Sequence, residues 1–380
     1  MCVMTDDCDA LSRDTGGGVF TAQIAKSANS SSVSRTGWLN GPFLTNGKWI
    51  TDASGLAVTY AGVNLPGHVE TMIPEGLQYQ SVSDVVSMVK SIGMNSIRLT
   101  CSIEMIDQIE ENGGRDIAIS AAFVNALGQE NGTSVFEKKA GWCCTPVDGN
   151  TWWGDTYFPV GNWTRGLSYK ADHGKQWSNL MSMSLRNELR QPILDSQLFS
   201  ESYNWQDWYK YVKEGVLIFL SGLDSDTTLQ PVVQRTALTP GSSSFNREDF
   251  PADKLVLELH NYANILGSEV NNCAVLQQKR FQGGFQALQD GSPNIFPVVM
   301  TEYGFQQDAT TWQGTFAACL QTFLADLQAG WTIWALPGSY YIRRDAQDAN
   351  EPWGLLTHDW SGWRSPEHIN GSLAELRWAE

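Results

Sequence analysis

The sequence predicts an α/β protein, a (β/α)8 TIM barrel in which one strand unit is not visible. With 380 residues the chain is long enough for one large barrel. Apolar runs of strand type alternate with helix-like stretches from about residue 49 onward, which is the pattern of a parallel βα array. Several of these runs end in polar residues, where barrel strands carry their functional groups.

The predicted elements follow one another along most of the chain. Strands are predicted at residues 57–64, 95–101, 180–188, 216–222, 255–262, 296–302 and 331–335. Residues 82–92 and 312–327 carry apolar side chains at helical spacing, and Gly93 and Gly330 are expected to end these two helices. Residues 1–45 are rich in small and polar residues and are expected to form a poorly ordered leader, whereas residues 46–380 form a single domain.

The third strand unit is missing from this pattern. Between residues 101 and 180 there is a helix-like stretch at 117–127 and a Trp-rich loop, and only residues 134–136 could supply a short strand. At residues 211–217 a helix is also predicted to run into a strand through Gly215 with almost no connection. We therefore expect an incomplete barrel with unpaired strand edges.

Composition excludes several classes of partner. The formal net charge is −16, from 41 acidic and 25 basic residues, so the surface repels nucleic acid. No apolar run is long enough to span a membrane. The 7 cysteines show no zinc-ligand spacing, so neither a metal nor another cofactor is expected. A monomer is the default expectation.

The cysteines and glycosylation sequons favour an extracellular glycoprotein. Sequons stand at Asn29, Asn131, Asn162 and Asn370. Some cysteines are expected to pair in that compartment, and the odd number leaves at least one over. No signal peptide is visible in the acidic N-terminal stretch.

Two glutamates close predicted strands. Glu188 follows Asn187 at the end of one run, and Glu302 ends another. Two strand-end carboxylates suit glycoside hydrolysis, in which one protonates the leaving oxygen and the other attacks the anomeric carbon. Glu258 is the main rival, but it lies further from its strand end and is expected to be a buried structural group.

Other polar and aromatic residues stand at the same strand ends. Arg98, His260, Tyr262 and Trp334 each lie near the end of a predicted strand, and His260 and Tyr262 are two apart, so they project to the same side. The 16 tryptophans add flat faces on which a sugar ring can stack, although core packing explains any one of them about as well. The tryptophans in or beside polar loops are Trp142, Trp152, Trp153, Trp163, Trp205 and Trp208.

These motifs resemble the active-site signature of glycoside hydrolase family 5, and the order along the chain agrees. The signature residues are Arg98, Asn187-Glu188, His260-Asn-Tyr262, Thr301-Glu302-Tyr-Gly and Trp334. Fungal cellulase-like members of that family resemble residues 46–370, including Gly67-His68, Pro74-Glu-Gly-Leu-Gln-Tyr79, Trp142-Cys-Cys144, Trp152-Trp-Gly-Asp155 and Arg186-Asn-Glu188.

The resemblance implies a retaining double displacement. In this scheme Glu302 is the nucleophile and Glu188 the general acid/base, with their carboxyl groups about 5 to 5.5 Å apart. His260 then tunes Glu188, Asn187 binds the sugar 2-hydroxyl, and Trp334 forms the floor of the subsite that holds the cleaved residue. Arg98 and Tyr262 are expected to keep Glu302 ionised if they reach it. The implied substrate is a β-linked oligo- or polysaccharide, a glucan first and a mannan or smaller glycoside next.

The chain departs from the family pattern in one respect. The histidine that closes the family's third strand unit is not found, and none of the 5 histidines replaces it. The alternative to an active hydrolase is therefore a non-catalytic carbohydrate-binding or inactive relative. A third alternative, an unrelated barrel enzyme acting on a phosphate or through a metal, is opposed by the acidic surface and by the lack of ligand spacing.

Overall fold

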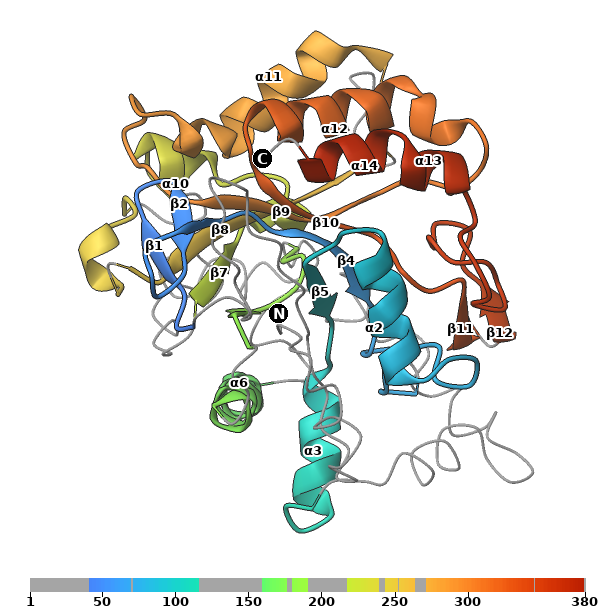
Figure 1. Cartoon of the computed structure of the whole chain (residues 1–380). Coiled ribbons are helices and arrows are strands. Elements are labelled where there is room, and N and C mark those ends of the chain that lie inside the picture. Colours follow the sequence, from blue (N-terminus) through green and yellow to red (C-terminus); the bar gives the residue numbers. More distant parts are fainter. Residues whose placement is uncertain are drawn as a thin grey trace.

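A seven-stranded parallel sheet forms the centre of the computed structural model (Figure 1). The structure describes residues 41–69, 71–115, 159–175, 180–190, 217–238, 243–251, 253–263, 271–344 and 346–378. The strands of this sheet are β4 (Ala61–Leu65), β5 (Ser96–Leu99), β6 (Ser182–Ser184), β7 (Leu217–Ser221), β8 (Leu255–Tyr262), β9 (Val298–Gly304) and β10 (Gly330–Ile333). All seven predicted strands of the sheet are confirmed, although β6 is shorter than the run that predicted it.

The strand order is that of a barrel interrupted at one place. The order is β5-β4-β10-β9-β8-β7-β6, so the first strand of the sheet pairs with its last. Within the described residues, the two edge strands of this sheet are β5 and β6, which are consecutive strands of the sheet along the chain. This is the position of the third strand unit that the sequence lacked. The predicted segments 117–127, 134–136 and 211–216 lie outside the described residues.

Helices cover the outer face of the sheet. The longer ones are α2 (Val82–Ser91), α3 (Ile103–Glu111), α6 (Val160–Gly174), α11 (Cys273–Gly283) and α12 (Thr315–Asp326). Shorter ones are α9 (Leu223–Asp226), α10 (Gln230–Gln234), α13 (Pro366–Asn370) and α14 (Ser372–Trp378), with 3-10 turns η2 (Arg247–Asp249), η4 (Phe285–Leu288) and η5 (Thr311–Gln313). Figure 1 shows α11, α12 and α14 lying side by side over β9 and β10.

The helix predicted at residues 82–92 forms because its cap and its apolar stripe agree. The Ser81 side chain accepts a hydrogen bond from the Asp84 N–H, which satisfies one free donor at the helix start. Val85, Val86 and Val89 are buried against the sheet. Gly93 takes a left-handed φ of 77° after the helix, as predicted.

The prediction for Gly330 is wrong. Helix α12 ends at Asp326, and Gln328 supplies the left-handed residue with a φ of 52°. Gly330 is instead the first residue of β10, where a Cβ would lie 3.1 Å from Val299 and 3.2 Å from Tyr60. Its small size serves close packing between strands rather than helix termination.

A small antiparallel sheet closes the N-terminal end of the barrel. It consists of β1 (Leu44–Asn46), β2 (Trp49–Thr51) and β3 (Ala57–Val58), so ordered structure begins before the boundary that we predicted at residue 46. Phe43 and Ile50 pack against the lower barrel residues Phe219 and Val256. A second hairpin, β11 (Ser339–Arg343) and β12 (Ala346–Asn350), projects beyond β10.

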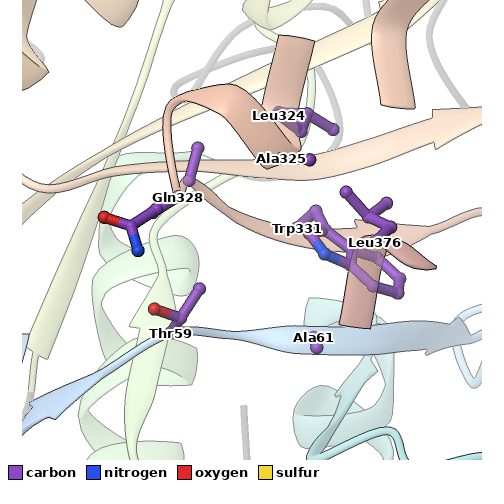
Figure 2. A pocket seen from close by; sticks show the side chains of 8 residues that line it. Thr59, Ala61, Leu324, Ala325, Gln328, Trp331 and Leu376 are labelled. Carbon is purple, nitrogen blue, oxygen red and sulfur yellow. The ribbon is translucent and has the colours of Figure 1, made fainter. Parts of the chain in front are cut away.

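A shallow pocket lies at the strand starts rather than at their carboxyl ends (Figure 2). It is lined by Thr59, Ala61, Leu324, Ala325, Gln328, Ala329, Trp331 and Leu376. Ala61 and Trp331 stand at or next to the first residues of β4 and β10. This crevice between sheet and helices offers no titratable side chain, and it does not contain the predicted site residues.

Two cysteines of the described chain are joined. Cys273 at the start of α11 is bonded to Cys319 in α12, so a covalent link ties two of the covering helices together. Cys101 is a free thiol, and the other cysteines lie outside the described residues. Among the described residues, no helix is both long and apolar enough to cross a bilayer.

His368 joins α13 to α12 in a buried contact. Its Nδ1 lies 2.8 Å from the Gln307 Oε1, and its Nε2 lies 3.0 Å from the Gln321 amide nitrogen. The Gln321 amide donates to Nε2, so the imidazole here is neutral. Burial lowers the pKa of His368 from 6.5 to about 4.

We predict that this histidine makes the fold sensitive to acid. The unfolded chain takes up a proton near pH 6.5 and the folded one only near pH 4, so the contribution of His368 is complete above pH 6.5 and is lost as the pH falls toward 4. The loss should reach about 3 kcal/mol. Urea unfolding between pH 7 and pH 4 would measure it. A His368→Gln variant should lose less stability over this range than the parent, and an equal loss would contradict the assignment.

Candidate active site

The predicted site residues meet at the carboxyl ends of the strands. Arg98 lies on β5, Glu188 follows β6, His260 and Tyr262 lie on β8, and Glu302 lies on β9. In a parallel barrel all carboxyl ends open at one rim, so residues more than 200 positions apart come into contact. The structure thus brings the predicted cluster together.

Glu302 is a buried carboxylate with a donor on each oxygen. The Arg98 Nη1 lies 2.5 Å from Oε1, and the Tyr262 hydroxyl donates to Oε2 at 2.7 Å. Burial by itself would raise the pKa of Glu302, but the charges of His260 and Arg98 and these hydrogen bonds hold it below its ordinary value. Glu302 is therefore ionised at neutral pH.

Asn64 fixes the guanidinium that faces Glu302. This fully buried residue of β4 accepts from the Arg98 Nη1 at 2.9 Å, while its own amide lies 3.0 Å from the Thr301 carbonyl. The Arg98 Nη2 donates to Asn187 at 3.0 Å. Asn64 was not singled out from the sequence, although it is a polar residue near the end of an apolar run, which is the signal that identified the others.

Glu188 stands in a left-handed turn beyond β6. Its φ is 48°, and its side chain is 12% exposed. Oε1 lies 3.1 Å from the His260 Nδ1, and Oε2 lies 2.5 Å from the Arg190 Nη2. Arg190, two residues along the chain, was not predicted because no periodicity or motif marks it as facing the site.

The two glutamates face each other across His260. The His260 Nδ1 lies 3.1 Å from a Glu188 oxygen and 3.6 Å from a Glu302 oxygen. One oxygen from each carboxylate and a ring nitrogen of His260 all lie within 4.8 Å of one another. Both carboxylates can therefore reach a single substrate atom, which was the geometry required of this pair.

His260 carries positive charge in this surrounding. Burial would lower the pKa of His260, but the charge of Glu302, the hydrogen bond to Glu188 and the charge of Asp226 raise it to about 9. Asp226 is fully buried, and its Oδ2 lies 3.8 Å from the His260 Nε2. No motif in the sequence marks Asp226.

Glu258, the rival carboxylate, lies deeper in the barrel. It is fully buried and accepts hydrogen bonds from the hydroxyls of Ser184, Ser221 and Thr301 at 2.8, 2.6 and 3.0 Å. A register shift in the pairing of β8 with β9 falls between Leu259 and His260, just beyond it. Glu258 is confirmed as a buried structural group and does not belong to the facing pair.

The remaining predicted residues occupy the rim. Asn187 is exposed apart from its contact with Arg98, and Trp334 is half-buried directly after β10. Trp353, which was not predicted, lies with its ring centre 5.7 Å from that of Tyr262 and also borders Gly304. Trp334 and Trp353 are both partly exposed, so the part of the rim next to Tyr262 and β10 is aromatic.

Trp163 is a core residue rather than a rim residue. It is 1% exposed in α6, and its indole N–H donates to the Leu185 carbonyl at 3.1 Å. For this tryptophan the core alternative holds because its side chain fills the space between α6 and the segment after β6. The other tryptophans of the polar loops, Trp142, Trp152, Trp153, Trp205 and Trp208, lie outside the described residues.

Three side chains of the site are close enough together to hold a metal ion, namely Glu188, His260 and Glu302. The four carboxylate oxygens already accept from Arg98, Tyr262, Arg190 and His260. A cation would have to displace these donors and lie against positive charge. The arrangement suits proton transfer and nucleophilic attack better than ion binding.

Comparison with known proteins relates the chain to carbohydrate-active enzymes. A glycosyl hydrolase 5 family protein of Chamaecyparis obtusa is 31% identical over 373 residues, covering 87% of this chain and 65% of that protein. An endoglucanase of Paenibacillus polymyxa is 21% identical, covering 87% of this chain and 86% of that protein. These relatives confirm the resemblance to the family, and the chain spans 65% of the length of the first of them. No protein-family model matches the chain.

Solved structures support the barrel. An endocellulase from Pyrococcus horikoshii in complex with cellotetraose has a TM-score of 0.57 and 19% sequence identity, covering 88% of this chain and 98% of that one. At this identity the likeness bears on the fold alone. It confirms the predicted barrel class.

The Tyr262 hydroxyl should hold Glu302 ionised. We predict that Tyr262→Phe raises the pKa of Glu302 by about one unit, because a hydrogen bond to a charged group is worth roughly 1.5 kcal/mol. Carboxyl carbon NMR titration would measure the shift. Tyr303→Phe is a matched control on the adjacent strand, since Tyr303 packs against Phe305 and Trp331 instead. Equal titration in parent and Tyr262→Phe would refute this role.

Proposed function

We propose that this chain, a relative of the glycosyl hydrolase 5 family, is a retaining β-glycoside hydrolase that cleaves a β-linked glucan. The observation that carries the proposal is the pair of facing glutamates, Glu188 and Glu302, with oxygens within 4.8 Å of each other. The retaining course is proposed from the resemblance to the family, for which a carboxyl separation of about 5 to 5.5 Å is expected, against roughly 6.5 to 9.5 Å for inversion.

Glu302 is the nucleophile of this scheme. Its oxygens are held by Arg98 and Tyr262, and its lowered pKa keeps it charged. It attacks the anomeric carbon, and the bond from that carbon to the leaving oxygen breaks as the glycosyl-enzyme ester forms. The buried guanidinium also fixes the direction of attack, because Asn64 and Asn187 hold it on two other sides.

Glu188 is the acid and then the base. In the first step its proton passes to the leaving oxygen, and the carboxylate that remains accepts hydrogen bonds from His260 and Arg190. In the second step Glu188 takes a proton from water, which attacks the anomeric carbon and releases Glu302. The Glu188 Oε2 accepts from Arg190 in this structure, so that contact must be lost if this oxygen is the one that carries the proton to the leaving group.

A β-glucan of the cellulose type is the preferred substrate. Asn187 stands beside Arg98 where a sugar 2-hydroxyl would reach it, and Trp334 offers an apolar face to a pyranose ring. The Paenibacillus relative is an endoglucanase, and the Pyrococcus structure holds cellotetraose. A β-mannan is the nearest alternative.

An inactive relative is the alternative, because one strand unit and its histidine are missing. The remaining residues of the site argue against this alternative. Each of them lies within hydrogen-bonding distance of another residue of the site: Arg98, His260, Tyr262, Glu188 and Glu302. A non-catalytic sugar-binding protein has no need of two carboxylates kept in different environments.

We also propose that the chain is an extracellular glycoprotein. The Cys273–Cys319 bond suits an oxidising compartment. Of the sequons, Asn370 ends α13 with an exposed side chain, so a glycan there would meet no steric obstacle. Asn162, in α6, is only partly exposed.

Replacement of either glutamate should reveal its role. Glu302→Gln should lower kcat on soluble β-glucan by roughly 10³-fold or more, because the nucleophile is removed. Glu188→Ala should be slow in water but regain turnover of an activated aryl glycoside with azide, giving a β-glycosyl azide. Reducing-sugar and product assays on β-glucan and β-mannan would measure this, with Glu248→Gln, an exposed glutamate remote from the rim, as control. Full activity in Glu302→Gln would disprove the scheme.

Glycosylation at Asn370 can be tested separately. Secretion of the chain from a eukaryotic host should yield a form whose mass falls after treatment with an N-glycosidase. Asn370→Gln should remove one glycan from the intact mass and leave the fold unchanged, because the side chain is exposed. An identical glycoform pattern in parent and variant would show that this sequon is unused.

A further inference from the structure

The end of β7 and the segment after it hold the segment that carries Glu188. The Ser221 hydroxyl, which also contacts Glu258, lies 2.8 Å from the Arg186 carbonyl oxygen, and the Ser225 N–H donates to the Leu189 carbonyl at 2.9 Å. Between these two contacts, the Glu188 N–H donates to the Asp226 Oδ2 at 2.8 Å. Three contacts thus hold Arg186, Glu188 and Leu189, the residues around the acid/base carboxylate of the proposed mechanism.

Asp226 supports a backbone conformation that glutamate rarely adopts. Glu188 has a φ of 48°, and Ser225 and Asp226, on the opposing segment, have φ values of 60° and 57°. Left-handed conformations at residues other than glycine persist only where the surrounding structure enforces them. The Asp226 carboxylate supplies the contact to the Glu188 backbone and so helps to set the direction in which the Glu188 side chain projects.

Asp226 also stands behind His260. The imidazole has Glu188 and Glu302 on its Nδ1 side at 3.1 and 3.6 Å, and Asp226 on its Nε2 side at 3.8 Å. His260 and Asp226 are both fully buried, and neither the His260 Nε2 nor the Asp226 Oδ1 has a hydrogen-bond partner. A movement of less than about 1 Å would bring the His260 Nε2 within hydrogen-bonding range of the Asp226 Oδ2, which lies 3.8 Å away.

Titratable groups from several strand ends lie around His260. Glu188 after β6, Asp226 after β7 and Glu302 on β9 act directly on its pKa. Arg98 on β5 and Tyr262 on β8 contact Glu302, Arg190 contacts Glu188, and Glu258 lies deeper on β8. Burial raises the pKa of Asp226, and the charge of His260 opposes that rise.

We propose that Asp226 is a positioning residue for the acid/base step, fixing the Glu188 backbone through its N–H and holding His260 against the Glu188 carboxylate. This inference rests on the proposed function, because it assigns Asp226 to the proton-transfer half of that mechanism. Asp226 touches neither Glu302 nor its partners Arg98 and Tyr262 in the hydrogen-bond network. Because Arg98 and Tyr262 still hold the Glu302 oxygens when Asp226 is lost, its loss should impair proton transfer more than nucleophilic attack.

Leaving-group dependence separates these two effects. A 2,4-dinitrophenyl β-glycoside leaves without protonation, so its kcat/KM reports on attack by Glu302, whereas an oligosaccharide needs the proton from Glu188. We expect Asp226→Ala to lower kcat/KM on a β-gluco-oligosaccharide by roughly 10- to 100-fold and on the dinitrophenyl glycoside by less than about 3-fold. Azide should raise kcat of this variant on the dinitrophenyl glycoside, where deglycosylation limits turnover.

Two further variants separate geometry from charge. Asp226→Asn keeps an oxygen for the Glu188 N–H but removes the charge behind His260, so it should recover part of the oligosaccharide activity and shift the pH profile. Asp52→Asn is a matched control, because Asp52 is also buried and accepts backbone N–H groups, those of Ser54 and Leu56, in the N-terminal hairpin region. It should change melting temperature without separating the two substrates.

The outcomes distinguish this inference from the function on which it rests. If the parent cleaves both substrates and Asp226→Ala loses them equally, with no azide effect, Asp226 is merely structural and the inference fails alone. If the parent cleaves neither substrate, the proposed function fails and the inference with it. Imidazole nitrogen NMR gives a reading that needs no turnover, since the His260 titration midpoint should fall in Asp226→Asn, and an unchanged midpoint would also overturn the inference.

Discussion

The buried ion pair between Arg98 and Glu302 is the constraint around which the rim is organised. Both side chains are at most 7% exposed, and a carboxylate at such a site is tolerated only when it is paired and hydrogen-bonded. Asn64 on β4 and Tyr262 on β8 complete that pairing from two other strands. Because the four groups come from β4, β5, β8 and β9, the charge can stay buried only if those strands keep their positions in the barrel.

The second carboxylate is held in a different way, so the two glutamates have different surroundings. Glu302 lies on a strand and contacts a buried cation, whereas Glu188 lies in a left-handed turn, is partly exposed and contacts the partly exposed side chain of Arg190. A rigid ionised group suits nucleophilic attack, and a group with access to solvent suits proton exchange. His260 lies between the two glutamates, so its charge acts on both carboxylates.

Much of this could be predicted from local pattern, and the exceptions have physical causes. The strands were found because buried parallel strands are short apolar runs, and the common side of His260 and Tyr262 followed from their spacing of two residues. Gly330 was misassigned because glycine suits both a helix end and a crowded strand contact, and only the neighbouring Tyr60 and Val299 decide between them. For Trp163 the sequence left core packing and sugar contact both open, because burial in α6 depends on what packs against that helix.

The sequence by itself determined the barrel class and the polar strand ends that meet at the rim, the two glutamates among them, because apolar runs and the polar residues that close them are local features of the chain. Only the tertiary structure decided which groups surround those glutamates. Asn64, Arg190 and Asp226 lie in the chain without a motif, and their roles arise from the order of the parallel strands and from left-handed turns that bring separate loops into hydrogen-bonding distance. Contacts of this kind depend on the position of every strand in the sheet, which no short stretch of sequence specifies.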